Sequence, residues 1–343
     1  MNGLKVAIVG ATGAVGTELI KLLEDSQIPI SCLRLIASSR SARREVKFRG
    51  TSSLVDVIED ASDAAFDIAF FSAGGATSLK WAPQFAAKGA LVIDNSNAFR
   101  MDSDVPLVVP QVNPKMLASR PNRGIVANPN CSTIQFVRAL RPLAQSFSIR
   151  QIVLTTYQAA SGGGLRGINE LLTDAKSVLD GTGEPTSERF PVSLAFNVVP
   201  QVGELSDDGV SLEERKLVQE SRKILGLPNL KLTATCVRVP VINGHSEAIY
   251  IELTEFIPLN NVRELLAREL GIQLYEEAGC CAYPTPRLLD NHGHVHIGRI
   301  RTNPDDSRGL WMWVVANNLQ VGAALNAVQI GELAYRNRLM GAQ

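Results

Sequence analysis

Near its N-terminus the chain reads KVAIVGATGAVGTELIKLL from residue 5 to residue 23. The apolar run 5–9 is typical of a buried parallel strand, and the apolar residues that follow recur at the spacing of an amphipathic helix. Between them, Gly10, Gly13 and Gly16 follow a G-x-x-G-x-x-G spacing, which allows a tight turn and brings N–H groups of the helix start close to a pyrophosphate. The unit predicts dinucleotide binding, although a purely structural strand-to-helix turn uses glycines in the same way.

The rhythm of apolar runs changes along the chain. Before about residue 128, short apolar runs alternate with helical segments, at residues 5–9, 33–37, 67–71 and 90–93. This alternation predicts a doubly wound parallel sheet. Later runs are longer and richer in β-branched residues, at residues 151–157, 231–239 and 247–254. They predict a mainly antiparallel sheet with covering helices. We therefore expect an α/β fold, a Rossmann-type doubly wound domain followed by an α+β domain.

Composition excludes several classes of protein. The 343 residues are 45% hydrophobic and 20% charged, and 34 basic residues balance 34 acidic ones. Such a chain is globular rather than disordered, and without net charge it is not expected to bind nucleic acid or an anionic membrane. The long uncharged window 310–331 carries five amide side chains, which argues against a membrane span. Five irregularly spaced cysteines do not form a disulfide scaffold, so we expect a reducing cytoplasm.

The segment after the second expected strand bears on the choice of cofactor. An acidic residue there holds the ribose of NAD, whereas an arginine accommodates the 2′-phosphate of NADP. Here the run 33–37 is followed by Ser38, Ser39, Arg40 and Ser41, with no acid before Glu45. We therefore predict NADP as cofactor. The alternative is an ordinary solvated basic face.

Cys131 lies in the sequence NPNCST at residues 128–133, followed by apolar residues at helical spacing. Pro129 and Asn130 favour a turn, so Cys131 is expected at a helix N-terminus, where the helix dipole stabilises a nucleophilic thiolate. A buried, unreactive cysteine is the alternative. His245, in a polar stretch expected to be a hinge between two strands, could supply acid/base chemistry, or be a hydrogen-bonded structural histidine.

Three further histidines, His292, His294 and His296, alternate along the chain and would share one face of an extended segment. Alternating histidines can bind a transition metal, but no suitably spaced carboxylate or cysteine completes the ligand set. We expect no metal.

Eight short motifs occur in order along nearly the whole chain: GATGAVG (10–16), SAGG (72–75), DNSNAFR (94–100), NPNCST (128–133), TYQAASG (156–162), FNVVP (196–200), RVP (238–240) and GHSE (244–247). In this combination the chain resembles the aspartate-semialdehyde dehydrogenase family. The resemblance implies NADP-dependent interconversion of L-aspartate 4-semialdehyde plus phosphate with 4-phospho-L-aspartate, through a cysteine thioester. That reaction belongs to lysine, threonine and methionine biosynthesis.

The resemblance also implies roles for single residues. Cys131 matches the nucleophile, His245 the acid/base residue and Gln158 the amide that positions the substrate. The substrate-binding positions are Arg100, Asn130, Glu213, Lys216 and Arg238, with Arg100 and Lys216 on the phosphate. The cofactor-binding positions are Gly10, Thr12, Gly13, Ala14, Val15, Ser38, Arg40, Ser41, Ser72, Ala73, Gly74, Ser161, Gly162 and Asn318.

The resemblance to this family also implies a domain organisation and an oligomeric state. It implies an NADP-binding domain of residues 1–128 and 319–343, a catalytic and dimerisation domain of residues 129–318, and a homodimer or homotetramer. Asn317, Val321 and Gln111 depart from the family pattern.

Two alternatives stay open. One is a related acyl-phosphate or acyl-CoA reductase, of the N-acetyl-glutamyl-phosphate or malonyl-CoA type. The other is a catalytically silent paralogue that binds NADP.

Overall fold

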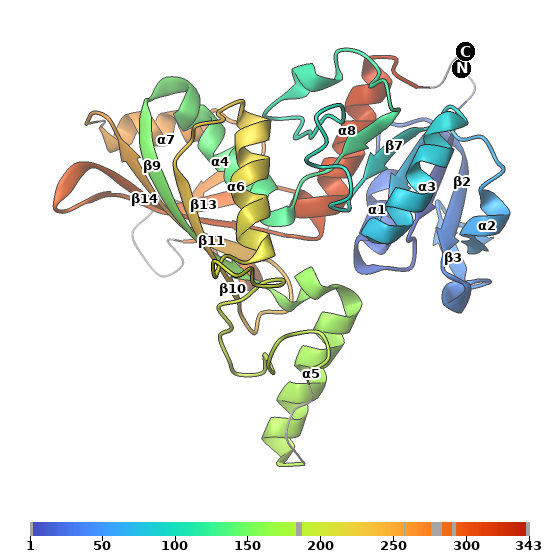
Figure 1. The fold of residues 1–343 in the computed structure, drawn as a ribbon, viewed down its shortest axis with the longest axis horizontal. Helices are drawn as coiled ribbons and strands as arrows, with labels where there is room; N and C mark the ends of the chain where they lie inside the picture. The colour runs from blue at the N-terminus through green and yellow to red at the C-terminus, as the bar shows by residue number, and fades with distance from the viewer. Residues whose placement is uncertain (1–2, 183–186, 257, 276–282, 290–292, 341–343) are drawn as a thin grey trace. The chain divides into compact units, whose positions relative to one another are not determined.

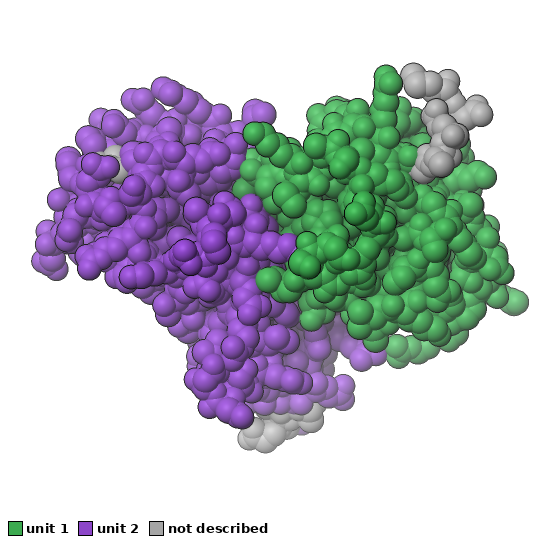
Figure 2. Space-filling view, turned by 45° about the horizontal axis from the view of Figure 1, so that its top comes forward, with its two compact units in different colours: residues 1–130, 323–343 green, residues 131–322 purple. Residues whose placement is uncertain are grey.

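The computed structural model describes residues 3–182, 187–256, 258–275, 283–289 and 293–340. The chain forms two compact units, residues 1–130 with 323–343 and residues 131–322 (Figure 2). The expected boundaries at 128/129 and 318/319 lie within a few residues of these junctions. The assignment of cofactor binding to the first unit and of catalysis and dimerisation to the second stays a prediction. Within the described ranges, every helix is too short or too polar to cross a bilayer.

The first unit contains a six-stranded parallel sheet in the order β5-β2-β1-β6-β7-β8. Figure 1 labels β2 and β7 of this sheet. Its strands are β1 (Leu4–Val9), β2 (Ile30–Ala37), β5 (Asp56–Val57), β6 (Ile68–Phe71), β7 (Leu91–Asp94) and β8 (Ile125–Ala127). A hairpin of β3 (Glu45–Phe48) and β4 (Thr51–Leu54) is separate from it. The helices are α1 (Ala14–Glu24), α2 (Ile58–Ala61), α3 (Gly75–Ala87) and α8 (Leu325–Arg336), and the 3₁₀ segments are η1 (Ser39–Ser41) and η2 (Pro114–Leu117). The expected doubly wound sheet is confirmed.

The C-terminal helix α8 completes the first unit. Asn326 donates from Nδ2 to Asn128 Oδ1 at 2.6 Å and to the Val108 carbonyl at 3.0 Å. Gly331 packs so closely that a Cβ there would lie 3.2 Å from the Phe70 ring. The expected return of the C-terminal segment to the nucleotide-binding sheet is therefore present, with amides as well as apolar residues at the contact.

In the glycine turn, a Cβ would clash at two of the three glycines and would fit at the third. Gly10 has φ +93°, and a Cβ there would lie 2.4 Å from the Ser72 carbonyl oxygen. A Cβ on Gly16 would lie 2.1 Å from the Gly10 oxygen, whereas one on Gly13 would meet nothing nearer than 3.4 Å. Strand packing thus requires Gly10 and Gly16, and Gly13 caps α1 beside an opening.

The second unit is built on a mixed six-stranded sheet in the order β10-β9-β11-β14-β13-β12. Its strands are β9 (Ile149–Gln158), β10 (Leu232–Arg238), β11 (His245–Leu253), β12 (Ile272–Tyr275), β13 (Val295–Asn303) and β14 (Asp306–Ala316). The helices are α4 (Cys131–Ser146), α5 (Gly164–Asp180), α6 (Leu212–Leu225) and α7 (Leu259–Ala267), with short segments η3 (Ala160–Gly163), η4 (Pro286–Leu288) and η5 (Gln320–Ala324).

This sheet is antiparallel at its centre, as expected, but its two edge strands pair in parallel, β10 with β9 and β12 with β13. The chain between β9 and β10 runs through α5 and α6, and such a long crossover allows a strand to re-enter in parallel. The apolar pattern of a strand predicts burial but not the direction of pairing.

The two faces of this sheet differ. The helix α4 packs against β13 and β14, and α6 packs against β10. On β14, Leu310, Met312 and Val314 are buried, whereas the alternate residues Trp311 and Trp313 are only partly buried. Helix α5 projects away from the sheet (Figure 1). The second unit therefore presents a helix-covered face and an aromatic face.

Candidate functional site

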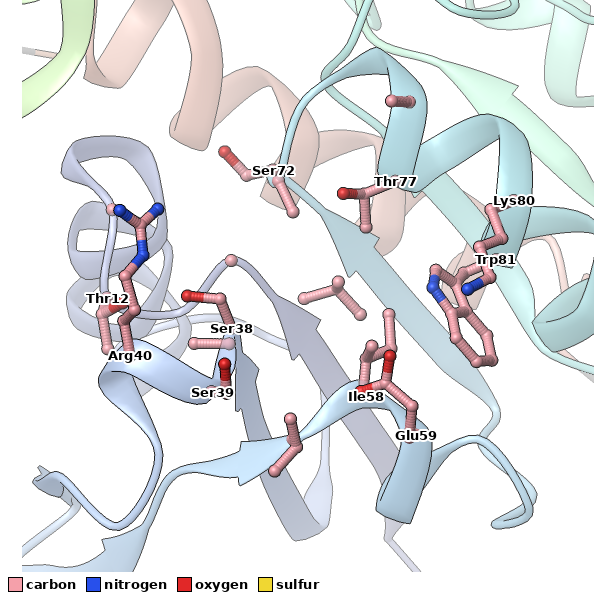
Figure 3. A pocket seen from close by; sticks show the side chains of 17 residues that line it. Thr12, Ser38, Ser39, Arg40, Ile58, Glu59, Ser72, Thr77, Lys80 and Trp81 are labelled. Atoms are coloured by element: carbon pink, nitrogen blue, oxygen red, sulfur yellow. The ribbon is translucent and has the colours of Figure 1, made fainter.

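A cavity of about 680 Å³ lies at the carboxyl ends of β1, β2 and β6 in the first unit (Figure 3). The expected cofactor residues that line it are Gly10, Thr12, Gly13, Ser38, Arg40, Ser72 and Ala73. Four expected residues of the same unit do not line it, namely Ala14, Val15, Ser41 and Gly74, and the remaining three, Ser161, Gly162 and Asn318, belong to the second unit. Parallel sheets bind nucleotides at this edge, next to the start of the first helix.

The lining fits a dinucleotide phosphate. Gly13 caps α1 without a side-chain hydrogen bond, so the first-turn N–H groups of this helix have no side-chain acceptor at the cap. Thr12 and Arg40 lie together at one side of the cavity (Figure 3). A guanidinium and hydroxyl groups at this place suit an additional phosphate better than an acidic residue would.

The other side of the cavity is formed by residues that no motif predicted. Glu59 comes from α2, and Lys80 and Trp81 come from α3. In Figure 3 these three side chains lie across the cavity from Arg40. The Lys80 ammonium lies 4.7 Å from the centre of the Trp81 ring. The sequence around these residues predicts helices but gives no sign of a binding site. Only the fold shows that α3 lies at the edge of the cavity.

Cys131 is the first residue of α4, as the sequence predicts, and it is partly exposed. It lies close enough to Arg238 to interact electrostatically with the guanidinium. Gly322, in the π-helical segment η5, packs against it: a Cβ on Gly322 would lie 2.8 Å from Cys131 Cβ. A helix start and a neighbouring cation both stabilise a thiolate.

His245 is not in a polar hinge, as the sequence suggested, but is the first residue of β11 and fully buried. The connection between the two strands lies earlier in the chain than expected, because β10 ends at Arg238 and β11 begins at His245 itself, which pairs with Ala316 of β14. The Ala159 N–H donates to Nδ1 at 3.0 Å, so the proton of the neutral ring is on Nε2. Nε2 has no hydrogen-bond partner within the described ranges.

The protonation state of His245 follows from its surroundings. Burial lowers the pKa of His245 well below its ordinary value, and the positive charge of Arg238 lowers it further. The imidazole is therefore neutral near pH 7 and presents an Nε2–H donor rather than a lone pair.

Arg238 ends β10 and is 7% exposed. It donates to the Ala159 carbonyl at 2.7 Å, and its guanidinium lies 5.6 Å from the centre of the Phe190 ring. Burial lowers the pKa of Arg238, while the charges of Glu213 and Cys131 oppose this. One residue, Ala159, thus holds both the imidazole through its N–H and the guanidinium through its carbonyl.

Gln158 ends β9 and begins a short polar chain. The Thr156 hydroxyl donates to Gln158 Oε1 at 3.1 Å, and Gln158 Nε2 donates to Glu213 Oε1 at 3.1 Å. Lys216 lies 3.5 Å from the other Glu213 oxygen, one turn along α6. The structure therefore brings together Gln158, Glu213 and Lys216, which are far apart in the sequence.

Ser161, Gly162 and Asn318 form a corner next to His245. Asn318 Oδ1 accepts from the Ser161 hydroxyl at 3.0 Å and from the Gly244 N–H at 2.8 Å. A Cβ on Gly162 would lie 2.6 Å from Arg238 Nη1 and 3.4 Å from His245 Nε2. Only glycine leaves this space open beside both side chains.

Two expected substrate residues belong to the first unit. Arg100 donates to the Asn128 carbonyl at 2.9 Å and to the Asn95 carbonyl at 2.8 Å, and is thus anchored to the segment that precedes Cys131 in the chain. Asn130 is buried and directly precedes Cys131.

Two of the three residues expected to depart from the family pattern have hydrogen-bond partners, and the third is buried. Asn317 Oδ1 accepts from the N–H groups of Leu319 and Gln320, a capping role that an acid would also fill. Gln111 donates to Gln329 at 2.7 Å. Val321 is buried.

Of the histidine triplet, His292 lies outside the described residues, as do Cys280 and Cys281 among the cysteines. His294 and His296 have ring centres 6.5 Å apart, and His296 Nδ1 lies 3.2 Å from the Tyr275 hydroxyl. Within the described ranges no group of three or more His, Cys, Asp or Glu could hold a metal ion.

The order of the parallel sheet, the glycine turn and the cavity beside it define a nicotinamide-dinucleotide oxidoreductase whose second unit carries a cysteine at a helix start. The model of the semialdehyde dehydrogenase NAD-binding domain matches residues 5–120, and that of the semialdehyde dehydrogenase dimerisation domain matches residues 140–321. The chain belongs to the aspartate-semialdehyde dehydrogenase family.

Relatives that match along nearly their whole length support the assignment to this family. Aspartate-semialdehyde dehydrogenase of Aquifex aeolicus is 44% identical over 98% of this chain and 100% of that protein, and that of Bacillus subtilis is 41% identical over 96% and 97%. The crystal structure of aspartate semialdehyde dehydrogenase II from Vibrio cholerae, complexed with ASA, has a TM-score of 0.92 and 43% identity, covering 98% of this chain and 99% of that chain. An aspartate semialdehyde dehydrogenase from Candida albicans, solved with NADP, has a TM-score of 0.74 and 25% identity, covering 98% and 99%.

The contact between Gly322 and Cys131 predicts how a larger residue at position 322 affects the reactivity of the sulfur. A Gly322→Ala side chain would displace the first turn of α4, so alkylation of Cys131 by iodoacetamide should slow about 10-fold. Quenched time courses with peptide mass spectrometry measure this rate, and the exposed Cys32 in the same molecule is the internal control. An unchanged rate at Cys131 would show that the contact does not position the sulfur.

Proposed function

We propose that this protein catalyses the reversible, phosphate-dependent oxidation of L-aspartate 4-semialdehyde to 4-phospho-L-aspartate with NADP. In the cell it would run as reduction, toward lysine, threonine and methionine. The observation that carries this proposal is the buried Arg238, which interacts with both Cys131 and His245. The identity of 41–44% to enzymes named for this activity supports it.

The buried charges match an amino-acid aldehyde. Arg238 offers a planar guanidinium to the substrate carboxylate, and Glu213 offers a carboxylate to its amino group. Gln158, which already bonds to Glu213, would orient the carbonyl carbon at the sulfur. The pairing of one cation with one anion favours a free amino acid over an N-acetylated substrate, which has no ammonium group for Glu213.

The chemistry then follows from the protonation states. The Cys131 thiolate attacks the aldehyde carbon, and the resulting alkoxide is stabilised by the Nε2–H of neutral His245. A bound nicotinamide supplies the hydride acceptor. Loss of hydride from the carbon converts the alkoxide to a thioester without removal of a proton, and phosphate then displaces the Cys131 thiolate to give the acyl phosphate. In reduction, the same N–H stabilises the same alkoxide.

Phosphate binding requires fixed cations, and Arg100 and Lys216 are the residues we assign to it. Lys216 lies on α6 beside Glu213, and Arg100 is held by two carbonyl groups that restrict its side chain. Asn130, directly before the nucleophile, is assigned to the substrate. These three roles rest on the family resemblance together with burial or anchoring.

We assign NADP to the cavity of the first unit, with Arg40 and Ser38 on the 2′-phosphate and Gly10, Thr12 and Gly13 at the pyrophosphate. The lining described above and the Candida albicans relative solved with NADP support this choice. Ser161, Gly162 and Asn318 are assigned to the nicotinamide end. A reactive thiolate persists best in a reducing compartment, so we place the enzyme in the cytoplasm.

We further propose a homodimer, or a homotetramer made of dimers. The matched dimerisation model and the partly exposed aromatic face of the sheet support self-association. Helix α5 adds a row of exposed leucines at seven-residue spacing, Leu165, Leu172 and Leu179. Such a row on a projecting helix suits packing against a second copy.

The activity is tested by NADPH formation from L-aspartate 4-semialdehyde, phosphate and NADP. We expect turnover, and we expect Cys131→Ala to reduce it at least about 1000-fold while NADP affinity stays nearly unchanged. Preference for an N-acetylated aldehyde would favour the related reductase, and no turnover with any aldehyde would favour a silent paralogue. Loss of cofactor affinity in Cys131→Ala would contradict the separation of the two sites.

The 2′-phosphate assignment is tested by Arg40→Asp. We expect NADP affinity to fall about 10–100-fold, because a charged hydrogen-bond donor becomes a like charge, while NAD affinity changes little. Equilibrium titration of both cofactors measures this. Arg44→Asp, an equal charge change outside the cavity lining, is the matched control. Equal losses for NADP and NAD would refute the assignment.

The assembly is tested by Leu172→Glu. Because Leu172 is 50% exposed in the isolated chain, the change should cost little stability but weaken self-association at least about 10-fold. Analytical ultracentrifugation measures the dissociation constant. Thr173→Glu, about 100° further round the helix, is the control. An unchanged constant would place the interface elsewhere.

A further inference from the structure

Two buried polar residues, Gln135 and Glu247, follow Cys131 and His245 closely in the chain. Glu247, two residues after His245 on β11, and Gln135, four residues after Cys131 on α4, are both fully buried. The Gln135 amide lies beside the Glu247 carboxyl. Yet neither oxygen of Glu247 and neither amide atom of Gln135 has a partner of good hydrogen-bond geometry within the described ranges.

Four buried polar atoms without partners are costly, and native structures rarely contain them. A protonated carboxyl resolves all four at once, since it donates its O–H to the amide oxygen and accepts from the amide N–H. An ionised carboxylate can only accept, so it would leave the amide oxygen facing a negative charge. Burial raises the pKa of Glu247 well above its ordinary value, against a smaller opposing effect of Gln135.

The position of this pair follows from element geometry. Residues four apart on a helix lie on one face, about 6 Å apart along the axis. Residues two apart on a strand also lie on one face, about 6.6 Å apart. Cys131 precedes Gln135 by one helical repeat, and His245 precedes Glu247 by one strand repeat. A contact between Gln135 and Glu247 therefore constrains the distance between Cys131 and His245. Arg238 interacts with both Cys131 and His245, so the start of α4 and the start of β11 lie close together.

We propose that Gln135 and a protonated Glu247 form a cyclic pair of two hydrogen bonds, which fixes the first turn of α4 against β11 and so positions Cys131 relative to His245. Both are positioning residues, and neither touches the substrate. The inference rests on the proposed function only in taking Cys131 as the reactive group.

Infrared spectroscopy tests the protonation state without any turnover. The holoprotein should show the C=O absorption of a buried carboxylic acid at pH 7, and Glu247→Gln should remove it. Absence of this absorption from the parent protein, or its persistence in Glu247→Gln, would overturn the protonated pair.

Two matched variants test the positioning. Glu247→Gln can form the same cyclic pair through its amide, so its Tm and the pH profile of Cys131 alkylation should match the parent. Glu247→Leu leaves the Gln135 amide unpaired, so Tm should fall by about 3–10 °C and Cys131 alkylation at pH 7 should slow about 3–10-fold. Cys131→Ser identifies the signal of this cysteine.

The outcomes separate positioning from mere stability. In Gln135→Leu/Glu247→Leu no amide is left unpaired, so Tm should recover much of the loss. A lower Tm in Glu247→Leu with an unchanged alkylation profile would reduce the pair to a structural role and refute positioning. An altered profile in Glu247→Gln would show that the charge of Glu247 matters, and refute the neutral pair. Failure of the aldehyde assay alone would leave these results standing.

Discussion

Arg238 carries its positive charge at the end of β10, where almost no water reaches it. A buried cation persists only with compensating groups, and here they are the Ala159 carbonyl, the Phe190 ring, Glu213 and the sulfur of Cys131. Burial lowers the pKa of His245, and the charge of Arg238 lowers it further, so the imidazole is neutral. One guanidinium therefore interacts electrostatically with both the sulfur that we propose as nucleophile and the imidazole that we propose as its partner.

The helix start of α4 by itself would give a thiolate at Cys131 only modest stabilisation. A helix terminus stabilises a nearby charge by about 0.3–2 kcal/mol, and less where solvent screens it. A cation in a poorly hydrated site has a stronger effect over the same distance, because the effective dielectric constant is lower. The second unit combines the two at Cys131. It also fixes the imidazole tautomer through one backbone N–H, that of Ala159, so the Nε2–H is available without a carboxylate behind the ring.

Much of the fold could be predicted from local patterns, and the rest could not for identifiable reasons. Four of the parallel strands, β1, β2, β6 and β7, and the start of α4 at Cys131 were predicted because apolar period, glycines and turn residues are local signals. The parallel edges of the second sheet were not, since strand direction depends on the connections. His245 was placed in a hinge because its neighbours are polar, yet burial in β11 is decided by the strands beside it. Gly322, Glu59 and Trp81 gave no signal, because their relevance comes from what the fold brings next to them.

The amino-acid sequence alone was enough to establish the doubly wound domain, the class of cofactor and a cysteine at a helix start. These features depend on residues close together in the chain, and short spacings encode them directly. The tertiary structure decided how Gln158, Glu213, Arg238 and His245 meet, which nitrogen of the imidazole carries the proton, and that Gln135 lies against Glu247. Those properties depend on contacts between distant segments and on exclusion of water, and no local pattern specifies either.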